Sequence, residues 1–185
     1  MAAIQLPAAV TANLNEEQKA IMEKLIEMVK DEATSEDTKK QGLVRTPCFV
    51  VNNHKAENTK MRLIYSKSWV GDFSSDYPPP QILEWNDYDP RRRFDHEGQN
   101  GSAGGFVYAD GDADDTTARK WTVAFDRMQT KVYAEAGPMG PVDWNAVKFK
   151  LDNQSGPFSK HEDPVFKGVA IAFYDGLNLY AAFEN

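Results

Sequence analysis

Most of this chain alternates between apolar and polar residues, and that alternation limits the folds it can adopt. Successive side chains of a β-strand point to opposite faces of a sheet, so a period of two predicts strands that are buried on one face. The pattern predicts strands at residues 47–51, 61–65, 106–108, 121–125, 131–133, 147–151, 168–174 and 177–183. Short strands separated by turn residues are typical of a sandwich or barrel. We therefore expect a mainly β fold, an antiparallel β-sandwich.

The clearest turn is Asp175-Gly176, which separates the last two alternating runs. Asp-Gly tolerates the positive φ angles of a tight two-residue turn and is a strong hairpin signal. The last two predicted strands are therefore expected to pair as a hairpin.

One amphipathic helix is expected before the strands, over residues 13–32. Asn15 and Gln18 have the spacing of a capping box, in which each side chain satisfies a backbone amide of the other residue. Apolar residues then recur at helical spacing, at Ile21, Met22, Leu25, Ile26 and Val29. A helix that is apolar on one side only is expected to dock on another surface.

The chain is expected to form one domain over residues 1–185. Residues 33–42 show no apolar period and end in glycine, so they are expected to link the helix to a sandwich of residues 43–185.

Composition excludes several classes of partner. The net charge of −7 opposes general binding to nucleic acid, which needs clustered Lys and Arg. No apolar run approaches the length of a membrane span. The single cysteine, Cys48, excludes an intramolecular disulfide, and the first residues lack the pattern of a signal peptide. We expect a cytoplasmic protein, and an open sheet edge would allow it to pair with a second copy.

The glycine-rich stretch NGSAGGFVYADGDADDTTARKWTVAFD, residues 100–126, raises several chemical alternatives. A phosphate loop follows a strand and opens a helix, whereas these glycines precede a strand. A nucleophile elbow needs Gly where Asn100 stands, so Ser102 is not expected to be catalytic. The stretch is predicted to be a glycine-rich entry to a strand, an acidic turn and the next strand.

The acidic turn is also a candidate calcium site. Asp110, Asp112 and Asp114 place carboxylates at alternate positions, as a calcium loop does, but the later positions of that loop do not match. A solvated hairpin tip is the competing interpretation, and no other cofactor is expected.

Residues 66–100 are expected to form a long irregular segment that carries many aromatic residues. Most of these rings should pack against the sheet. Trp69, Tyr77, Trp85 and Tyr88 are the candidates for stacking on a carbohydrate or a lipid headgroup.

Nothing in the chain demands an enzyme. His54, His96 and His161 stand far apart without a zinc motif, and no pair of carboxylates stands out as an acid and a base. We expect no catalytic residues.

Several segments resemble the small jasmonate-induced proteins of plants. GSAGGFVY at residues 101–108, KWTVAF at 120–125 and KVYAE at 131–135 match the central strands of that family in order, and the tryptophan and proline motifs at 69–71 and 77–80 match upstream. The resemblance implies a plant protein associated with stress and defence, with no established catalytic activity. More distantly, the pattern is similar to the β-sandwiches of actinoporins and aegerolysins.

These resemblances leave three functions open. The first is a non-enzymatic, lectin-like protein that binds carbohydrate or a lipid headgroup. The second is a membrane-active cytolysin or insecticidal toxin whose helix, as in actinoporins, inserts into lipid. The third is a hydrolase with an unrecognised site.

Overall fold

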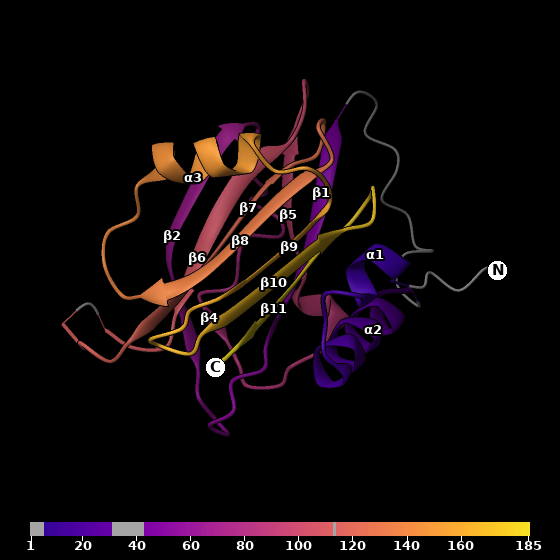
Figure 1. The fold of residues 1–185 in the computed structure, drawn as a ribbon. Coiled ribbons are helices and arrows are strands. Elements are labelled where there is room, and N and C mark those ends of the chain that lie inside the picture. Colours follow the sequence, from indigo (N-terminus) through magenta and orange to yellow (C-terminus); the bar gives the residue numbers. More distant parts are fainter. Residues whose placement is uncertain (1–5, 31–42, 113) are drawn as a thin grey trace.

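The computed structural model describes residues 6–30, 43–112 and 114–185, and it consists mainly of β-strands (Figure 1). The helices are α1 (Ala8–Thr11), α2 (Glu16–Lys30) and α3 (Trp144–Asp152), and one 3-10 turn, η1, covers Pro90–Arg92. The strands are β1 (Val44–Asn52), β2 (Met61–Val70), β3 (Asp72–Phe73), β4 (Ile82–Leu83), β5 (Phe94–Gly98), β6 (Ala103–Ala109), β7 (Arg119–Asp126), β8 (Lys131–Pro138), β9 (Phe158–Glu162), β10 (Val169–Tyr174) and β11 (Leu179–Glu184).

Two sheets pack face to face, so the predicted β-sandwich is confirmed. One sheet has six strands in the order β3-β5-β1-β11-β10-β9, and the other has five in the order β4-β2-β6-β7-β8. The predicted hairpins β6–β7 and β10–β11 are both present. The predicted linker, residues 33–42, lies outside the described residues, as do residues 31 and 32 of the predicted helix.

The core between the sheets is built from the inward faces of their strands. Trp121, Val123 and Phe125 of β7 share this face, as predicted, and all are buried. The Trp121 Nε1 donates to the backbone oxygens of Val169 and Glu184, each at 3.1 Å. A buried indole N–H without a partner would be costly, so these bonds fix the ring and join the two sheets.

One strand pair departs from the predicted antiparallel arrangement. β1 and β11 run parallel, with Cys48 opposite Leu179 at one end and Asn52 opposite Phe183 at the other. The C-terminal hairpin therefore inserts between β9 and β1. Cys48 is completely buried there, and burial raises the pKa of its thiol, so the thiol is inert packing.

The N-terminal helix docks on the outer face of the six-stranded sheet (Figure 1). Its capping box is confirmed, because the Gln18 amide donates to Asn15 Oδ1 at 2.8 Å and the Asn15 amide donates to Gln18 Oε1 at 3.3 Å. Met22 and Ile26 are buried in a cluster with residues of β1, β10 and β11. Among the described residues, no helix is long and apolar enough to cross a membrane.

Residues 66–100 are more regular than predicted. β2 continues to Val70, and β3, β4, η1 and β5 all fall within this range. Register shifts between Leu63 and Tyr65 and between Ser68 and Val70 break the alternation of β2 in the sequence. In β5, Asp95 and His96 are completely buried polar residues, so the apolar signal of a strand is missing.

The predicted strand at residues 147–151 is wrong, because this segment is helix α3. Asp143 caps the helix by accepting from the amides of Asn145 and Ala146. Val147 and Leu151 are one helical turn apart and buried, whereas Phe149 is 70% exposed. Val147 and Leu151 are four residues apart, a spacing that places two residues on one face of either a strand or a helix. The Asp143 cap favours the helix. α3 covers the outer face of the five-stranded sheet, on the side opposite to α2 (Figure 1).

Side chains close one side of the sandwich, where β9 of one sheet meets β8 of the other. The β8 amides of Ala134 and Ala136 donate to Ser159 Oγ at 3.0 Å and to His161 Nδ1 at 3.2 Å. These bonds satisfy edge amides that would otherwise attract another strand. They also hold β9 in place, and the outward face of β9 forms the site described next.

Candidate functional site

The four predicted ligand-binding aromatics are spread over the molecule. Trp69 lies at the end of β2, where its ring packs edge-on against Trp144 of α3, with centroids 5.9 Å apart. Tyr88 is buried in the cluster beneath α2, and Lys24 Nζ lies 3.9 Å from the centre of its ring. Trp69 and Tyr88 therefore belong to opposite outer faces of the sandwich.

The other two predicted aromatics are engaged locally. Tyr77 is 41% exposed and stacks with the guanidinium of Arg93, whose Cζ lies 4.8 Å from the ring centre. Trp85 is half-buried, and its Nε1 donates to the backbone oxygen of His54 at 2.7 Å. The structure does not unite the four residues in one site, and a ligand at any one of them stays a prediction.

The predicted calcium ligands differ in their surroundings. Asp110 accepts from the Arg119 amide at 2.6 Å and Nε at 3.0 Å, and lies 3.3 Å from His54 Nε2. Burial favours a higher pKa for Asp110, but these bonds to His54 and Arg119 outweigh it and lower the pKa. Asp112 pairs with Arg62 at 3.2 Å on the surface, and Asp114 is exposed. Within the described parts of the chain, no three His, Cys, Asp or Glu side chains are grouped to hold a metal ion. Calcium binding here stays a prediction.

Ser102 belongs to a hydrogen-bond relay between the sheets, which is buried at Ser102 and His96 and reaches the surface at Asp72. Thr46 Oγ1 donates to Ser102 Oγ at 2.7 Å, and Ser102 Oγ lies 3.0 Å from His96 Nδ1. His96 Nε2 lies 3.1 Å from Ser68 Oγ, which donates to Asp72 Oδ1 at 3.1 Å. Ser102 Oγ also donates to the backbone oxygen of His96 at 3.1 Å, so these bonds tie His96 of β5 to Ser102 and to Ser68 of β2.

The Ser102–His96 part of the relay is closed to a substrate. Ser102 and His96 are completely buried, and desolvation lowers the pKa of His96 to about 4 even though Asp72 opposes the shift. A neutral, enclosed imidazole supports the fold. The relay is therefore a structural element.

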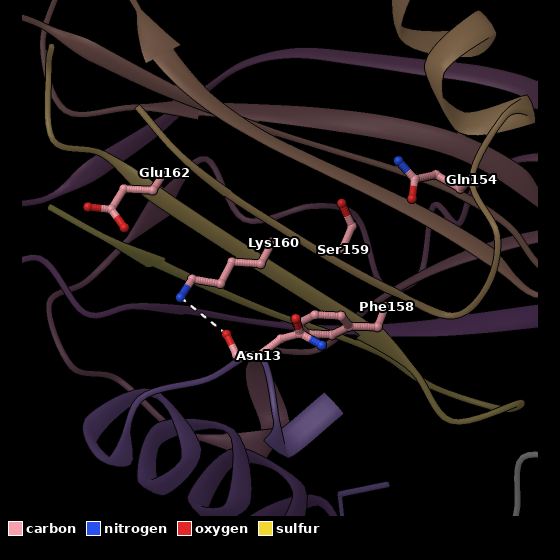
Figure 2. A pocket seen from close by; sticks show the side chains of 6 residues that line it. All are labelled: Asn13, Gln154, Phe158, Ser159, Lys160 and Glu162. Atoms are coloured by element: carbon pink, nitrogen blue, oxygen red, sulfur yellow. Dashed lines mark hydrogen bonds between the residues drawn. The ribbon is translucent and has the colours of Figure 1, made fainter. Parts of the chain in front are cut away.

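The strongest candidate site is an open hollow of about 480 Å³ along the outward face of β9. We call it the β9 hollow, and it is lined by Asn13, Gln154, Phe158, Ser159, Lys160 and Glu162. Figure 2 shows Lys160 and Glu162 following Phe158 along the strand, with Asn13 beside the N-terminal helices and Gln154 near the end of α3. Alternate residues of a strand share a face, so β9 presents a ring, an ammonium and a carboxylate in a row.

The Lys160 ammonium joins β9 to the N-terminal helical segment. It donates to Gln18 Oε1 at 2.8 Å. It also donates to the backbone oxygen of Asn13 at 3.3 Å (Figure 2). Gln18 in turn donates through Nε2 to Glu184 Oε2 at 3.1 Å. Glu184 is 7% exposed, and this desolvation raises the pKa of its carboxyl. One wall of the hollow is thus held by polar bonds, of which the Gln18–Glu184 bond is buried.

No residue of the β9 hollow was predicted from the sequence, although β9 carries a signal. Phe158, Lys160 and Glu162 alternate with Ser159 and His161, but neither set is apolar, so the hydrophobic period used to find strands is absent. Asn13 and Gln154 come from distant segments, and only the fold brings them to β9.

Comparisons with known proteins add the following. No family model matches the sequence, and no curated protein matches it. Among solved structures, the chain is similar to a lectin of the fungus Xerocomus chrysenteron, with 12% identity over 76% of this chain and 98% of the lectin and a TM-score of 0.47. A mutated form of the same lectin gives 12% identity, 77% and 97% coverage and a TM-score of 0.49.

Proposed function

We propose that this protein is a non-enzymatic β-sandwich that binds carbohydrate, and that the β9 hollow is its binding site. The observation that carries the proposal is the combination of one aromatic ring with amide, ammonium and carboxylate groups on a single strand face and its flanks. The apolar C–H face of a sugar packs on a ring such as Phe158. Amide and carboxylate side chains supply the mixed donors and acceptors that neighbouring hydroxyls need.

The position of the hollow supports recognition. Phe158, Lys160 and Glu162 project from a strand that pairs with β10 and is fixed to β8 by the Ser159 and His161 bonds. A site on a rigid strand loses little conformational freedom when ligand binds. An open polar hollow also suits a solvated sugar better than an apolar molecule.

A binding role rather than catalysis is supported by the lining groups. Glu162 is the one carboxylate among the six lining residues, and no lining side chain forms a nucleophile–base pair. Glycoside hydrolysis generally uses two carboxyl groups that flank the scissile bond. We retain, as the biological setting of this proposal, the cytoplasmic plant stress and defence role implied by the resemblance of the central strands.

The test is a glycan array probed with the full-length protein, followed by titration of each hit. Phe158→Ala should weaken binding by about 2- to 12-fold, corresponding to the ~0.5–1.5 kcal/mol of a specific aromatic contact. Phe149→Ala is a control that removes an exposed phenylalanine outside the hollow, and it should leave affinity unchanged. Phe158 also packs against the cluster beneath α2, so the folding of Phe158→Ala is checked by urea unfolding.

Two results would contradict the proposal. An array that retains no glycan counts against carbohydrate binding, and equal losses in the two phenylalanine variants count against the β9 hollow. Dye release from phospholipid vesicles, with no glycan retained, would instead favour the membrane-active alternative.

A further inference from the structure

The Lys160 ammonium has no carboxylate partner within the described residues. Its two bonds go to neutral oxygens, the Gln18 side-chain amide and the Asn13 carbonyl. Some lysines are paired with carboxylates, as in Lys60–Glu84 at 3.1 Å and Lys150–Glu135 at 2.9 Å, whereas Lys120, like Lys160, donates to neutral oxygens. Lys160 therefore brings an ammonium without a direct ion pair to the β9 hollow, whose other charged lining group is Glu162.

The Lys160 ammonium can donate to one more hydrogen-bond partner. Lys160 is half-buried, and taking a charged group out of water is unfavourable unless an opposite charge is near. An ammonium carries three hydrogens, and two of them are used. The third can bond a ligand, and an anionic acceptor gains more from it than a neutral one because charge-assisted bonds are stronger.

We infer that the ligand of the β9 hollow is an acidic carbohydrate, whose carboxylate or sulfate is bound by the Lys160 ammonium. This inference rests on the proposed function and names the class of sugar. Residues on the same strand face are about 6.6 Å apart, so a sugar ring packed on Phe158 holds a ring substituent within reach of Lys160. Glu162, the next residue on this face, accepts from hydroxyls and repels a second anionic group.

The N-terminal segment positions the ammonium. Gln18 is 3% exposed and is held both by the capping box and by its bond to Glu184, so it directs Lys160 without lining the hollow. By thermodynamic reciprocity, an anion bound at Lys160 also strengthens the docking of α2. Gln18 is thus a positioning residue of the site.

The experiment compares D-glucuronate with D-glucose. The two sugars differ only at C6, where glucuronate has a carboxylate and glucose has a hydroxymethyl group. Each sugar is titrated into ¹⁵N-labelled full-length protein while backbone resonances are followed by NMR. Glucuronate should bind about tenfold or more tightly, as expected for a hydrogen bond to a charged group, and this preference should shrink as salt is added. The resonances that shift should include those of β9.

Three variants refine the test. Lys160→Met should abolish the preference for glucuronate and Lys160→Arg should restore part of it. Lys67→Met, the matched control, removes an exposed lysine outside the hollow and should keep the preference. Gln18→Leu lies outside the hollow and should reduce the preference while leaving the affinity for glucose unchanged.

Each contrary outcome has a distinct meaning. Equal affinities for the two sugars, unaffected by Lys160→Met, would refute the acidic class and leave carbohydrate binding intact. Inorganic sulfate binding as tightly as glucuronate would also refute it, since the hollow would then be a bare anion site. Binding of neither sugar together with a blank glycan array would refute the proposed function itself. If Lys160→Met does not fold, the salt dependence of the unmodified protein decides.

Discussion

The buried imidazole of His96 should make the fold sensitive to acid. Desolvation lowers its pKa in the folded protein to about 4, from an ordinary value of 6.5. As the pH falls, the unfolded chain therefore takes up this proton first. The stability that His96 contributes is present above pH 6.5 and is lost as the pH falls from 6.5 towards 4.

The size of the loss follows from the two pKa values. Linkage between folding and protonation gives a loss of about 2 kcal/mol at about pH 5, and about 3 kcal/mol at about pH 4, relative to a mildly alkaline solution. The assay is urea unfolding at each pH, followed by the fluorescence of the tryptophans, with the slope checked for two-state behaviour.

Two variants isolate this contribution from other titrating groups. His96→Gln keeps an amide that can bond Ser68 but cannot titrate, so the difference in unfolding free energy from the parent should shrink by about 2 kcal/mol between mildly alkaline solution and about pH 5. Thr46→Val removes one hydroxyl from the same relay and should lower stability at every pH while keeping the acid slope. Parallel pH profiles for His96→Gln and the parent protein would refute this reasoning.

Three further substitutions test the outer face of the five-stranded sheet by urea unfolding. Gly105→Ala should cost about 1–3 kcal/mol, since its Cβ would lie 2.9 Å from Trp144 Cζ3, and an unchanged midpoint would contradict this close contact. Asp143→Ala should cost about 1 kcal/mol by uncapping α3, whereas Asp143→Asn should lose less. Phe149→Ser should change stability by less than about 0.5 kcal/mol because the ring is exposed. A large loss would instead indicate that Phe149 is buried, as the predicted strand at residues 147–151 requires.

The sandwich was predictable because its central strands obey a simple rule. β7 places Trp121, Val123 and Phe125 on the face of its sheet that lines the core between the sheets. β10 places Val169, Ile171 and Phe173 on the outer face of the six-stranded sheet, beneath α2. The N-terminal helix was predictable from its capping box and its apolar stripe. In each case local chemistry and burial agree, so the sequence alone carries the information.

The rest depends on contacts that no local pattern records. β5 buries Asp95 and His96 and so conceals its period, and β3 and β4 are too short to show one. The β9 hollow combines residues near both ends of the chain, with a strand whose inward side chains, Ser159 and His161, are polar because they bond the edge of β8. Its parts were visible in the sequence, but their proximity was not.

The place of β11 in the middle of its sheet has a consequence for biosynthesis. β1 is made early and β11 among the last residues of this sequence, yet the two are hydrogen-bonded neighbours. A nascent chain emerging from the ribosome must keep β1 and its apolar residues unpaired on one side until nearly all of these residues have been translated. Such delayed pairing exposes aggregation-prone surface, and deletion of β11 would leave a gap inside the six-stranded sheet, between β1 and β10.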